Sequence, residues 1–566
     1  MKKILLTICF AVLSLSMFAV KATTAAITVI QSDGTPITVY LHGDENFHWY
    51  TDAQGNILER NGNDFKKLPM TREAFFAKAR LIRSSNKAKR IGIGTGTSAY
   101  FPHVKSPKAL VILVQFPDSS RTDSTSHFTC ADPKKTFNDY LNAKGNLTNY
   151  GLNENRNYGS VYQYFNDMSG GQFTPQFDVV GPYTMSKLSS YYGQDSKSSH
   201  DIYLSQMVKE ACDSANKYVD FRNYDNNGDG TVDLVYIIYA GYSQSNGAPD
   251  DAIWPQAFPL NSGNYDGMKI GYCGVNNELN YYPGYKLKSA PYKRINGIGL
   301  FCHEFSHTLG LPDLYSNLAV DNQEMEYWDL MDGGEYTDNG YTPTPYTPWE
   351  KEVMGWTSID TLADDSVKVT MNPDDALKIN STTSQYVILQ NLQKQGWASK
   401  MLGHGLLVYR IDYGTRKAVN MGDMPNTTAG KPAVTIIPAD SLLISSYKVD
   451  DKKGPYTQEQ YIESQAGDPF PGSQNVDSLL QFTLNDGVVI NKPLYKITEE
   501  ASGDISFYYL KRPSTGTSTG VNAINVVPDY ADSRIFTIDG RFVGTDMSVL
   551  PKGVYIINHK KIVVGI

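Results

Sequence analysis

The sequence of 566 residues predicts a multidomain protein in which an α/β domain is followed by regions rich in β-strands. Two apolar, β-branched runs, 110–116 and 232–239, have the composition of buried central strands. Around them, apolar residues recur at helical spacing, which indicates helices packed against the same sheet. Beyond residue 359, short strand-like runs separated by turn residues are typical of packed β-sheets.

The first 22 residues predict a secretory signal peptide. Lys2 and Lys3 precede an apolar run over 4–20, and small residues follow at 22–26, so we expect cleavage near Ala22. A membrane anchor is the alternative, but the run is short for a membrane span and no later segment reaches that length. We therefore expect an exported protein that is secreted or attached to the cell surface.

Residues 23–105 predict a separate N-terminal unit with a linker. Short strands are expected at 27–30, 36–41 and 47–50, and a basic helix over 72–83. The stretch 84–96 combines Lys and Arg with three glycines, a composition that favours a flexible segment open to proteolytic nicking.

Residues 106–358 carry the α/β pattern. Ser160 is a candidate helix cap in front of apolar residues at helical spacing, and a second helix is expected over 204–212. A short helix over 348–356 closes the expected domain. Trp254 and the aromatic run 281–285 are candidates for lining substrate subsites, and core packing is the alternative for both.

A calcium loop is predicted immediately before the second buried run. Side-chain oxygens at alternating positions surround Gly230, the glycine expected at a tight turn. Tyr236 stands where an EF-hand has a bidentate Glu, so we expect a structural Ca²⁺ loop and not a helix-loop-helix sensor. An Asx-rich turn without an ion is the alternative. The candidate ligands are Asp225, Asn227, Asp229, Thr231 and Asp233.

The run 298–313 contains the pattern H-E-x-x-H and predicts a metal-binding helix. Residues four apart share one helix face, so His303 and His307 can bind one Zn²⁺ with Glu304 beside them as general base. Apolar residues mark the opposite face, which should leave the histidines at the edge of a cleft. Gly310 and the proline two residues later should end the helix and turn Asp313 back as third ligand. Two histidines that only pack or cap are the alternative.

The run 327–336 predicts a Met-containing turn below the histidines, a feature that metzincins place at this position. Met331 is the methionine of this turn, and a buried turn with no role at a metal is the alternative. Tyr336 is the nearest following phenol and a candidate second donor to the oxyanion.

Together these motifs resemble the immune inhibitor A family of secreted bacterial metalloproteases. The resemblance extends over residues 27–511 and implies a zincin-like catalytic domain, with a mixed sheet, an active-site helix and a Met-turn. It also implies that the N-terminal unit is propeptide-like, and we expect residues 23–105 to keep the enzyme latent until it is cut. It implies in addition that an aspartate, here Asp313, replaces the third histidine of metzincins. The motifs that carry it are 303–315 and 328–331, supported by 159–165, 177–182 and 467–472.

The C-terminal third is expected to be β-rich. Strand patterns at 367–371, 385–390, 405–412, 434–437 and 504–509 predict a β-sandwich over 359–511. Residues 512–520 form a Ser/Thr/Gly-rich linker, and 521–566 predict a small β module. This module resembles the C-terminal sorting domains of the type IX secretion system, which implies outer-membrane secretion machinery as a partner. A plain terminal β module is the alternative.

The charge and the cysteine content of the chain limit its partners and its possible metal ligands further. The net charge of −8 argues against a nucleic-acid partner. Four cysteines, Cys130, Cys212, Cys273 and Cys302, remain after signal-peptide removal, as disulfides or as small buried residues. The N-terminal unit has no cysteine to act as a thiol ligand, so Asp44 or Glu45 is the candidate to cap the metal before activation.

We therefore predict a secreted, monomeric zinc endopeptidase that acts on proteins or peptides. Zinc held by His303, His307 and Asp313 would activate a water molecule, and Glu304 would move its proton to the leaving amine. An adhesin on the same scaffold is an alternative of another class, which the intact Glu304 argues against. A zinc-dependent non-peptide amide hydrolase is the other alternative.

Overall fold

The computed structural model divides the chain into two compact units, Met1–Arg512 and Pro513–Ile566, which are described separately. In the first unit the structure describes residues 18–22, 26–44, 47–70, 74–75, 101–117, 126–145, 157–196, 199–280, 295–316, 322, 324–364, 368–381, 385–413, 423, 425–442, 444 and 456–512. In the second unit it describes 513, 535–537, 542–544, 550, 553–557 and 560–564. Most of the predicted signal peptide, the linker 84–96, the aromatic run 281–285 and most of the helix predicted over 72–83 lie outside these residues.

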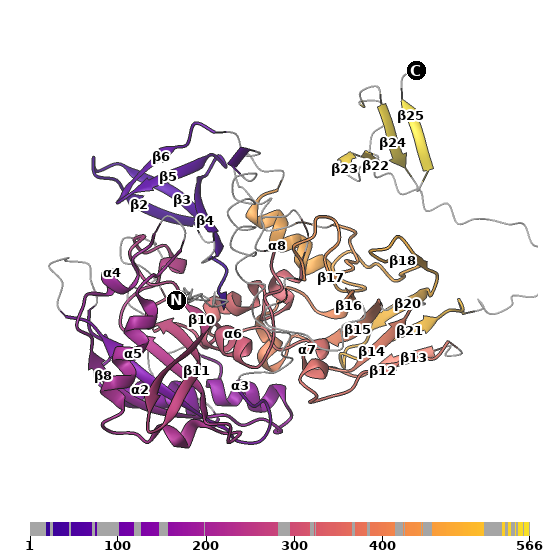
Figure 1. Ribbon diagram of the computed structural model, residues 1–566. Helices are drawn as coiled ribbons and strands as arrows, with labels where there is room; N and C mark the ends of the chain where they lie inside the picture. Colours follow the sequence, from indigo (N-terminus) through magenta and orange to yellow (C-terminus); the bar gives the residue numbers. More distant parts are fainter. Residues whose placement is uncertain are drawn as a thin grey trace, which may run out of the picture. The chain divides into compact units, whose positions relative to one another are not determined.

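A mixed sheet forms the centre of the α/β domain (Figure 1). Its order is β1-β10-β11-β9-β7-β8, with β11, β9, β7 and β8 parallel to one another and β10 antiparallel at one side. The two buried runs expected from the sequence are the neighbouring strands β7 and β9, which confirms both. The strands are β1 (Phe18–Ala19), β7 (Lys108–Gln115), β8 (Gln176–Thr184), β9 (Thr231–Tyr239), β10 (Gln256–Tyr265) and β11 (Met268–Asn277).

Helices cover both faces of this sheet because alternate residues of β7 point to opposite sides. Ala109, Val111 and Leu113 pack with α2, α3 and α6, whereas the residues between them pack with α5. Ser160 caps α3 as predicted, by accepting a hydrogen bond from the backbone of Gln163. The helices are α2 (Pro133–Asn142), α3 (Val161–Met168), α4 (Ser189–Tyr192), α5 (Leu204–Ala215), α6 (Ile298–Thr308) and α7 (Pro348–Val353).

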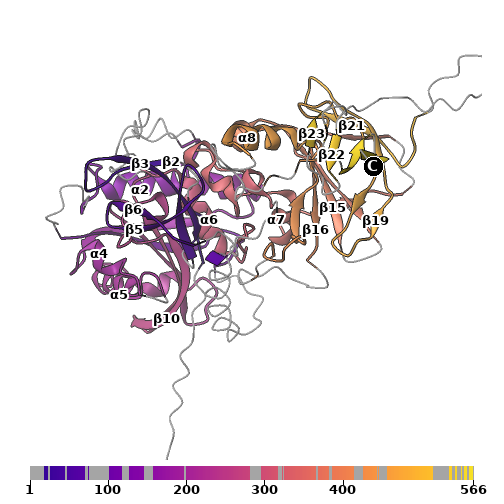
Figure 2. The ribbon, with the colours of Figure 1, turned by 90° about the horizontal axis from the view of Figure 1, so that it is seen from above.

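The N-terminal unit is an antiparallel five-stranded sheet, drawn in indigo in Figures 1 and 2. The three predicted strands are confirmed, and two further strands follow that the sequence did not predict. The core of this sheet includes Trp254 and Leu300, so it packs directly against the α/β domain. The strands are β2 (Ala26–Ile30), β3 (Pro36–Asp44), β4 (Phe47–Asp52), β5 (Ile57–Asn61) and β6 (Asp64–Lys67).

Residues 359–511 contain two larger sheets with one shared apolar core. The five predicted strands are present as β13, β15, β16, β17 and β21. The β-sandwich itself stays a prediction. One sheet comprises β12 (Asp360–Thr361), β14 (Ala376–Asn380), β15 (Tyr386–Leu392), β16 (Gly405–Ile411) and β17 (Val434–Ile436). The other comprises β13 (Lys368–Met371), β21 (Ile505–Tyr509) and β20 (Leu494–Glu499), and a hairpin, β18 (Phe482–Thr483) with β19 (Val489–Ile490), and a helix, α8 (Gln458–Gly467), accompany them.

The second unit contains a four-stranded antiparallel sheet of order β23-β22-β24-β25. Its strands are β22 (Ile535–Thr537), β23 (Phe542–Gly544), β24 (Gly553–Ile557) and β25 (Lys560–Val564). A small β module was expected here, but its proposed role in sorting stays a prediction.

The four cysteines whose pairing the sequence did not decide are free thiols. Cys212, Cys273 and Cys302 are buried, and burial raises the pKa of each thiol, so they act as small apolar core residues. Within the described part of the chain, no helix is both long and apolar enough to span a bilayer.

Candidate metal centre

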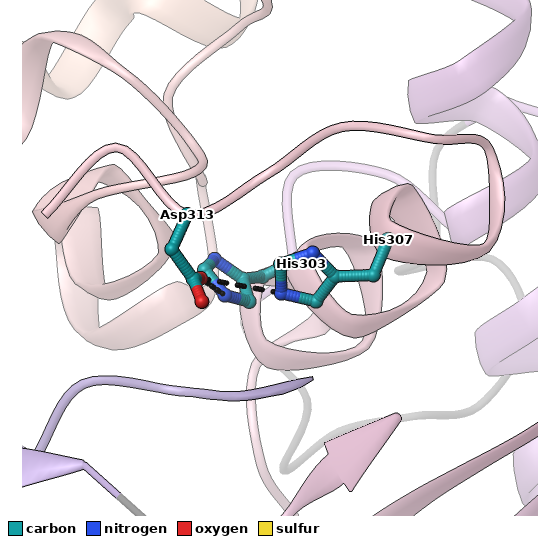
Figure 3. Close-up of side chains that lie close together, drawn as sticks. All are labelled: His303, His307 and Asp313. Atoms are coloured by element: carbon teal, nitrogen blue, oxygen red, sulfur yellow. Dashed lines mark ion pairs between the residues drawn. The ribbon is translucent and has the colours of Figure 1, made fainter. Parts of the chain in front are cut away.

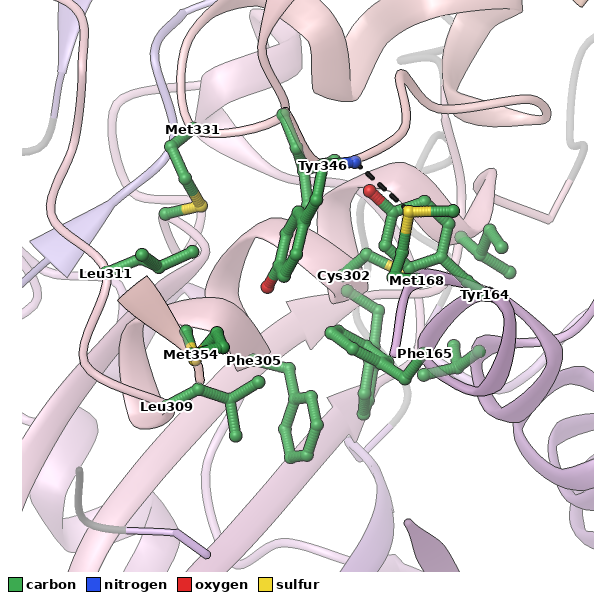
Figure 4. Close-up of a cluster of buried hydrophobic side chains, with 14 of the residues drawn as sticks. Tyr164, Phe165, Met168, Cys302, Phe305, Leu309, Leu311, Met331, Tyr346 and Met354 are labelled. Carbon is green, nitrogen blue, oxygen red and sulfur yellow. Dashed lines mark hydrogen bonds between the residues drawn. The ribbon is translucent and has the colours of Figure 1, made fainter. Parts of the chain in front are cut away.

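The helix α6 is fixed by its apolar face and by a sharp end. Phe305, Leu309 and Cys302 project into an aromatic and aliphatic cluster (Figure 4), which confirms the predicted buried face. Gly310 has φ +105°, and its N–H donates to the carbonyl of His307, so the helix ends where the sequence predicted. Gly299 faces the Met-turn, where a Cβ atom would lie 2.0 Å from the carbonyl oxygen of Glu335. A side chain at 299 would therefore push that segment away from the helix.

The three predicted metal ligands meet at one point (Figure 3). Nε2 of His303 and Nε2 of His307 each lie 3.2 Å from the same carboxylate oxygen, Oδ1 of Asp313. Among the described residues these three form one of two groups whose side chains could share a metal ion. The sequence spacing alone thus identified a set that the fold brings together.

Both imidazoles are oriented by backbone carbonyls. Nδ1 of His303 lies 2.9 Å from the carbonyl oxygen of Leu330, and Nδ1 of His307 lies 2.8 Å from that of Leu311. Because a carbonyl oxygen only accepts, each ring carries its proton on Nδ1, which leaves the Nε2 lone pair facing Asp313. This is the outer hydrogen bonding that metal-bound histidines require.

The charge state of the group also suits a divalent cation. Burial lowers the pKa of His303, which favours the neutral imidazole that binds metals. Burial alone would raise the pKa of Asp313, but His307 and His303 outweigh it and hold this pKa at about 2. Two imidazoles and one carboxylate form a donor set that fits Zn²⁺.

Glu304 and the Met-turn complete the centre. Glu304 is fully buried on the same helix as the histidines, and Met331 is buried in the turn that supplies the Leu330 carbonyl. Glu335 was not predicted, yet its carboxylate lies 3.8 Å from Nδ1 of His303. Burial raises the pKa of Glu335 well above its usual range, so a neutral carboxylic acid is favoured there.

Tyr336 contacts the N-terminal segment that contains Lys21. Its hydroxyl group donates a hydrogen bond to the carbonyl oxygen of Lys21 at 2.6 Å. The phenol is therefore presented to a peptide carbonyl, as its predicted role requires, although the catalytic role itself stays a prediction.

The histidines are more enclosed than expected. The sequence predicted a cleft edge, whereas His303 and His307 have no exposed surface. Residues 18–22 account for part of this cover: the Lys21 ammonium lies 5.8 Å from the centre of the Tyr315 ring, which in turn stacks on His303 at 6.5 Å.

Asp44 is not part of the centre. Its carboxylate accepts a hydrogen bond from the backbone N–H of Phe47 at 3.0 Å, and it does not belong to the metal-compatible group of described residues. Glu45, the other candidate, lies outside the described residues.

The predicted calcium loop is a tight turn stabilised by its own side chains. Asp225 accepts from the N–H groups of Gly228, Asp229 and Gly230, and Asp229 accepts from Thr231. Asp233 accepts from Asn226, and burial raises the pKa of Asp233 to about 6. The carboxylates do not form one of the metal-compatible groups among the described residues, so calcium binding stays a prediction.

Sequence reasoning missed a second acidic group, formed by Glu324, Glu326 and Asp332. All three are buried, and their carboxylate oxygens lie within 4.8 Å of one another. The sequence held a weak signal, since acidic residues alternate there with the apolar residues Met325 and Trp328. Acidic residues are usually exposed, so this signal did not separate a buried group from a solvated loop.

Part of this chain is similar in sequence to known metallopeptidases. Residues 97–357 match the family model described as "Immune inhibitor A peptidase M6, catalytic domain". This stretch is similar to the catalytic domain of immune inhibitor A peptidases. The chain is 26% identical over 287 residues to Immune inhibitor A of Bacillus thuringiensis subsp. alesti. The matched region covers 45% of this chain and 40% of that protein. It is 25% identical over 276 residues to Pre-pro-metalloprotease PrtV of Vibrio cholerae serotype O1. This second matched region covers 44% of this chain and 30% of that protein.

The chain thus spans less than half the length of these relatives. The match to immune inhibitor A peptidases includes the metal helix and the Met-turn, and it identifies a metallopeptidase domain within a mixed α/β fold. A metallopeptidase of this family requires a catalytic metal ion.

Proposed function

We propose that this chain is an exported zinc endopeptidase whose catalytic domain has the zincin layout. The observation that carries the proposal is the convergence of two Nε2 atoms on one Asp313 oxygen, with both Nδ1 atoms facing backbone carbonyls. An adhesin would not need Glu304 buried beside this group, so the protease is the better supported function.

His303, His307 and Asp313 would hold the zinc ion. When bound, zinc supplies a Lewis acid that lowers the pKa of a water molecule and polarises a carbonyl group. Asp313 contributes a full negative charge, since its pKa of about 2 keeps it ionised throughout the useful pH range.

Glu304 is the proposed general base. It is buried next to His303 on α6, where water is largely excluded and a carboxylate is a strong proton acceptor. In this proposal Glu304 accepts a proton from the attacking water and then donates it to the nitrogen atom of the leaving amine. Tyr336 donates a hydrogen bond to a carbonyl oxygen of the bound peptide, by analogy with its bond to Lys21.

The remaining parts of the chain support export and activation in this proposal. Residues 1–22 act as a signal peptide and 23–105 as a propeptide and linker, and activation occurs by cleavage within the Lys/Arg/Gly-rich stretch 84–96. Residues 359–511 form a β-sandwich that accompanies the catalytic domain, and 521–566 engage outer-membrane secretion machinery. The loop 225–233 binds a structural calcium ion, and the protein is a monomer.

The test is casein hydrolysis by the chain without its leader, nicked by trypsin in 84–96 and then treated with a serine-protease inhibitor. Truncation at residue 105 would be unsuitable, because the Phe101 ring packs 5.3 Å from that of Phe305 in the catalytic core. The parent and Glu304→Ala are compared, with bound zinc measured in both.

We expect the parent to cleave casein and to lose this activity with a chelator. Glu304→Ala should retain about one zinc ion per chain and lose at least ~100-fold in activity. If both proteins bind zinc and neither cleaves casein or gelatin, the protease proposal is wrong and a binding role is favoured.

A further inference from the structure

The buried acidic group Glu324, Glu326 and Asp332 holds the ammonium group of one lysine. Nζ of Lys21 lies 3.2 Å from Oδ1 of Asp332 and 3.7 Å from Oε2 of Glu326. The Lys21 side chain is only 7% exposed, so the ammonium group is inside the protein and not on its surface.

The carboxyl groups of this acidic group outnumber the ammonium group that they face. Three carboxyl groups face a single cation, and Oε2 of Glu324 has no hydrogen-bond partner among the described residues. Burial raises the pKa of Glu324 well above its usual range and that of Asp332 to about 6. Buried carboxylates are costly unless a cation or hydrogen bonds compensate them, so this arrangement favours a cationic occupant.

Neighbouring groups hold the carboxylates in position. The backbone N–H of Ser316 donates to Glu324, and the Tyr461 hydroxyl group donates to Glu326. The backbone N–H of Glu326 donates to Oδ2 of Asp332, which leaves Oδ1 for the ammonium group. The receptor is therefore preorganised by elements outside the segment that fills it.

The lysine reaches the group as part of an extended peptide along the sheet edge. Phe18 and Ala19 pair antiparallel with β10, opposite Ala257 and Gln256. The carbonyl oxygens of the next two residues accept hydrogen bonds from Trp254 Nε1 at 3.1 Å and from the Tyr336 hydroxyl group at 2.6 Å. Main-chain pairing with one buried side chain is a common way for a protein to recognise a peptide.

This peptide passes directly beside the candidate metal centre. The Lys21 ammonium lies over the ring of Tyr315, which stacks on His303. Asp332 follows Met331 in the turn whose Leu330 carbonyl orients His303. The acidic group and the metal ligands therefore both contact the same short turn, residues 330–332.

We propose that the acidic group is a substrate pocket selecting a lysine or arginine side chain, at the residue whose carbonyl oxygen accepts from Tyr336. The inference rests on the proposed peptidase function and specifies its substrate class. Removal of the leader near Ala22 takes Lys21 away with it, which opens the pocket to a basic residue of a protein substrate.

The test compares internally quenched peptides that are identical except for one central residue, which is Lys, Arg, Met or Glu. The nicked parent enzyme without its leader should cleave the Lys and Arg peptides with kcat/KM at least ~100-fold above that of the Met peptide. Mass spectrometry should show a cut at a fixed distance from the basic residue. Equal kcat/KM values for Lys and Met would overturn the proposal.

Two variants test which residues make the pocket. Asp332→Asn and Glu326→Gln should each reduce the Lys-to-Met ratio by at least ~10-fold, whereas Glu500→Gln, which also removes one negative charge, should leave it unchanged. Bound zinc in each variant shows whether the metal centre has folded. A ratio unchanged in both zinc-loaded variants would contradict the pocket.

A binding measurement keeps this inference separate from catalysis. In Glu304→Ala, fluorescence anisotropy should show the Lys peptide binding at least ~10-fold tighter than the Met peptide. Equal binding overturns the pocket, even if the parent cleaves casein. A preference for Lys in Glu304→Ala, together with no casein or peptide hydrolysis by the parent, supports the pocket and rejects the peptidase. Terbium luminescence supplies the last check, because Tb³⁺ or Ca²⁺ binding that Asp332→Asn abolishes would identify a metal site instead.

Discussion

Replacing Phe305 by alanine tests whether the aromatic cluster behind α6 holds the metal helix in place. Phe305 is fully buried, and its ring centre lies 5.0 Å from that of Phe165, 5.3 Å from that of Phe101 and 5.4 Å from that of Phe177. These neighbours come from separate elements of the core, so they cannot easily move together to fill the space of a missing ring. A buried Phe→Ala change of this kind costs about 3–5 kcal/mol of unfolding free energy.

Calorimetry of the zinc-loaded protein is the assay. In a domain of about 250 residues, 1 kcal/mol corresponds to roughly 2–4 °C, so a loss of about 4 kcal/mol lowers the transition by roughly 8–16 °C. Phe305→Leu is the control, because it keeps most of the apolar volume and should cost no more than ~1.5 kcal/mol. At 20 °C, bound zinc should be unchanged in both variants, since backbone carbonyls and not Phe305 orient the imidazoles.

Two results would refute this reasoning. A shift below about 3 °C for Phe305→Ala, no larger than for Phe305→Leu, would mean that the cluster does not anchor α6. Loss of zinc at 20 °C, in a protein that is still folded, would mean that the position of the ligands depends directly on packing behind the helix.

Four further outcomes follow from the same structure. Asp313→Asn removes the charge that faces both histidines and should weaken zinc binding at least ~10-fold, measured by competition with a chromogenic chelator. Zinc removal from the parent should lower its unfolding temperature, and zinc restored at 100 times its Kd should return about 2.7 kcal/mol. Deletion of residues 513–566, a separate compact unit, should leave the calorimetric transition of the remaining chain and its casein hydrolysis unchanged. Burial raises the pKa of Asp233 from ~3.9 to about 6, so the folded state binds more protons between these values. Stability without calcium should therefore fall as pH rises from about 4 to 6, and Asp233→Asn should remove most of that fall of ~1–3 kcal/mol in chemical denaturation.

Local sequence pattern was sufficient to predict the elements whose apolar residues either recur at helical spacing or form one continuous run. The metal helix and the Ser160-capped α3 show helical spacing, the buried strand β9 is a continuous apolar run, and all three are confirmed. The hairpin of β10 and β11 was missed because it contains Pro259 and shifts register twice, so its sequence resembles a loop. Those pairings depend on contact with β9 and on the turn at 266–267, which periodicity does not report.

The candidate site divides in the same way. His303, Glu304 and His307 lie within one helical turn and a half, and Asp313 follows a helix end marked by Gly310, so local geometry could bring all four together. Glu324, Glu326 and Asp332 come from an irregular stretch around the short turn Glu326–Trp328, where no period relates one side chain to the next. These carboxyl groups come together only in the folded chain, where they surround Lys21, which lies over three hundred positions away in the sequence.

The turn at 330–332 contacts both the metal ligands and the acidic pocket. It therefore determines which mutations can affect the pocket without affecting the metal centre. Its first residue orients His303 through a backbone carbonyl, which no side-chain substitution removes. Its last residue, Asp332, faces Lys21 and also accepts from the backbone of Glu326, so Asp332→Asn can disturb the turn as well as the pocket. The Glu326 carboxylate faces Lys21 and accepts from the Tyr461 hydroxyl group, so Glu326→Gln leaves the backbone hydrogen bond to Asp332 in place and is the cleaner variant. A loss of lysine preference in Glu326→Gln with zinc retained would therefore assign selectivity to the pocket, whereas the same loss in Asp332→Asn alone would leave the turn as its cause.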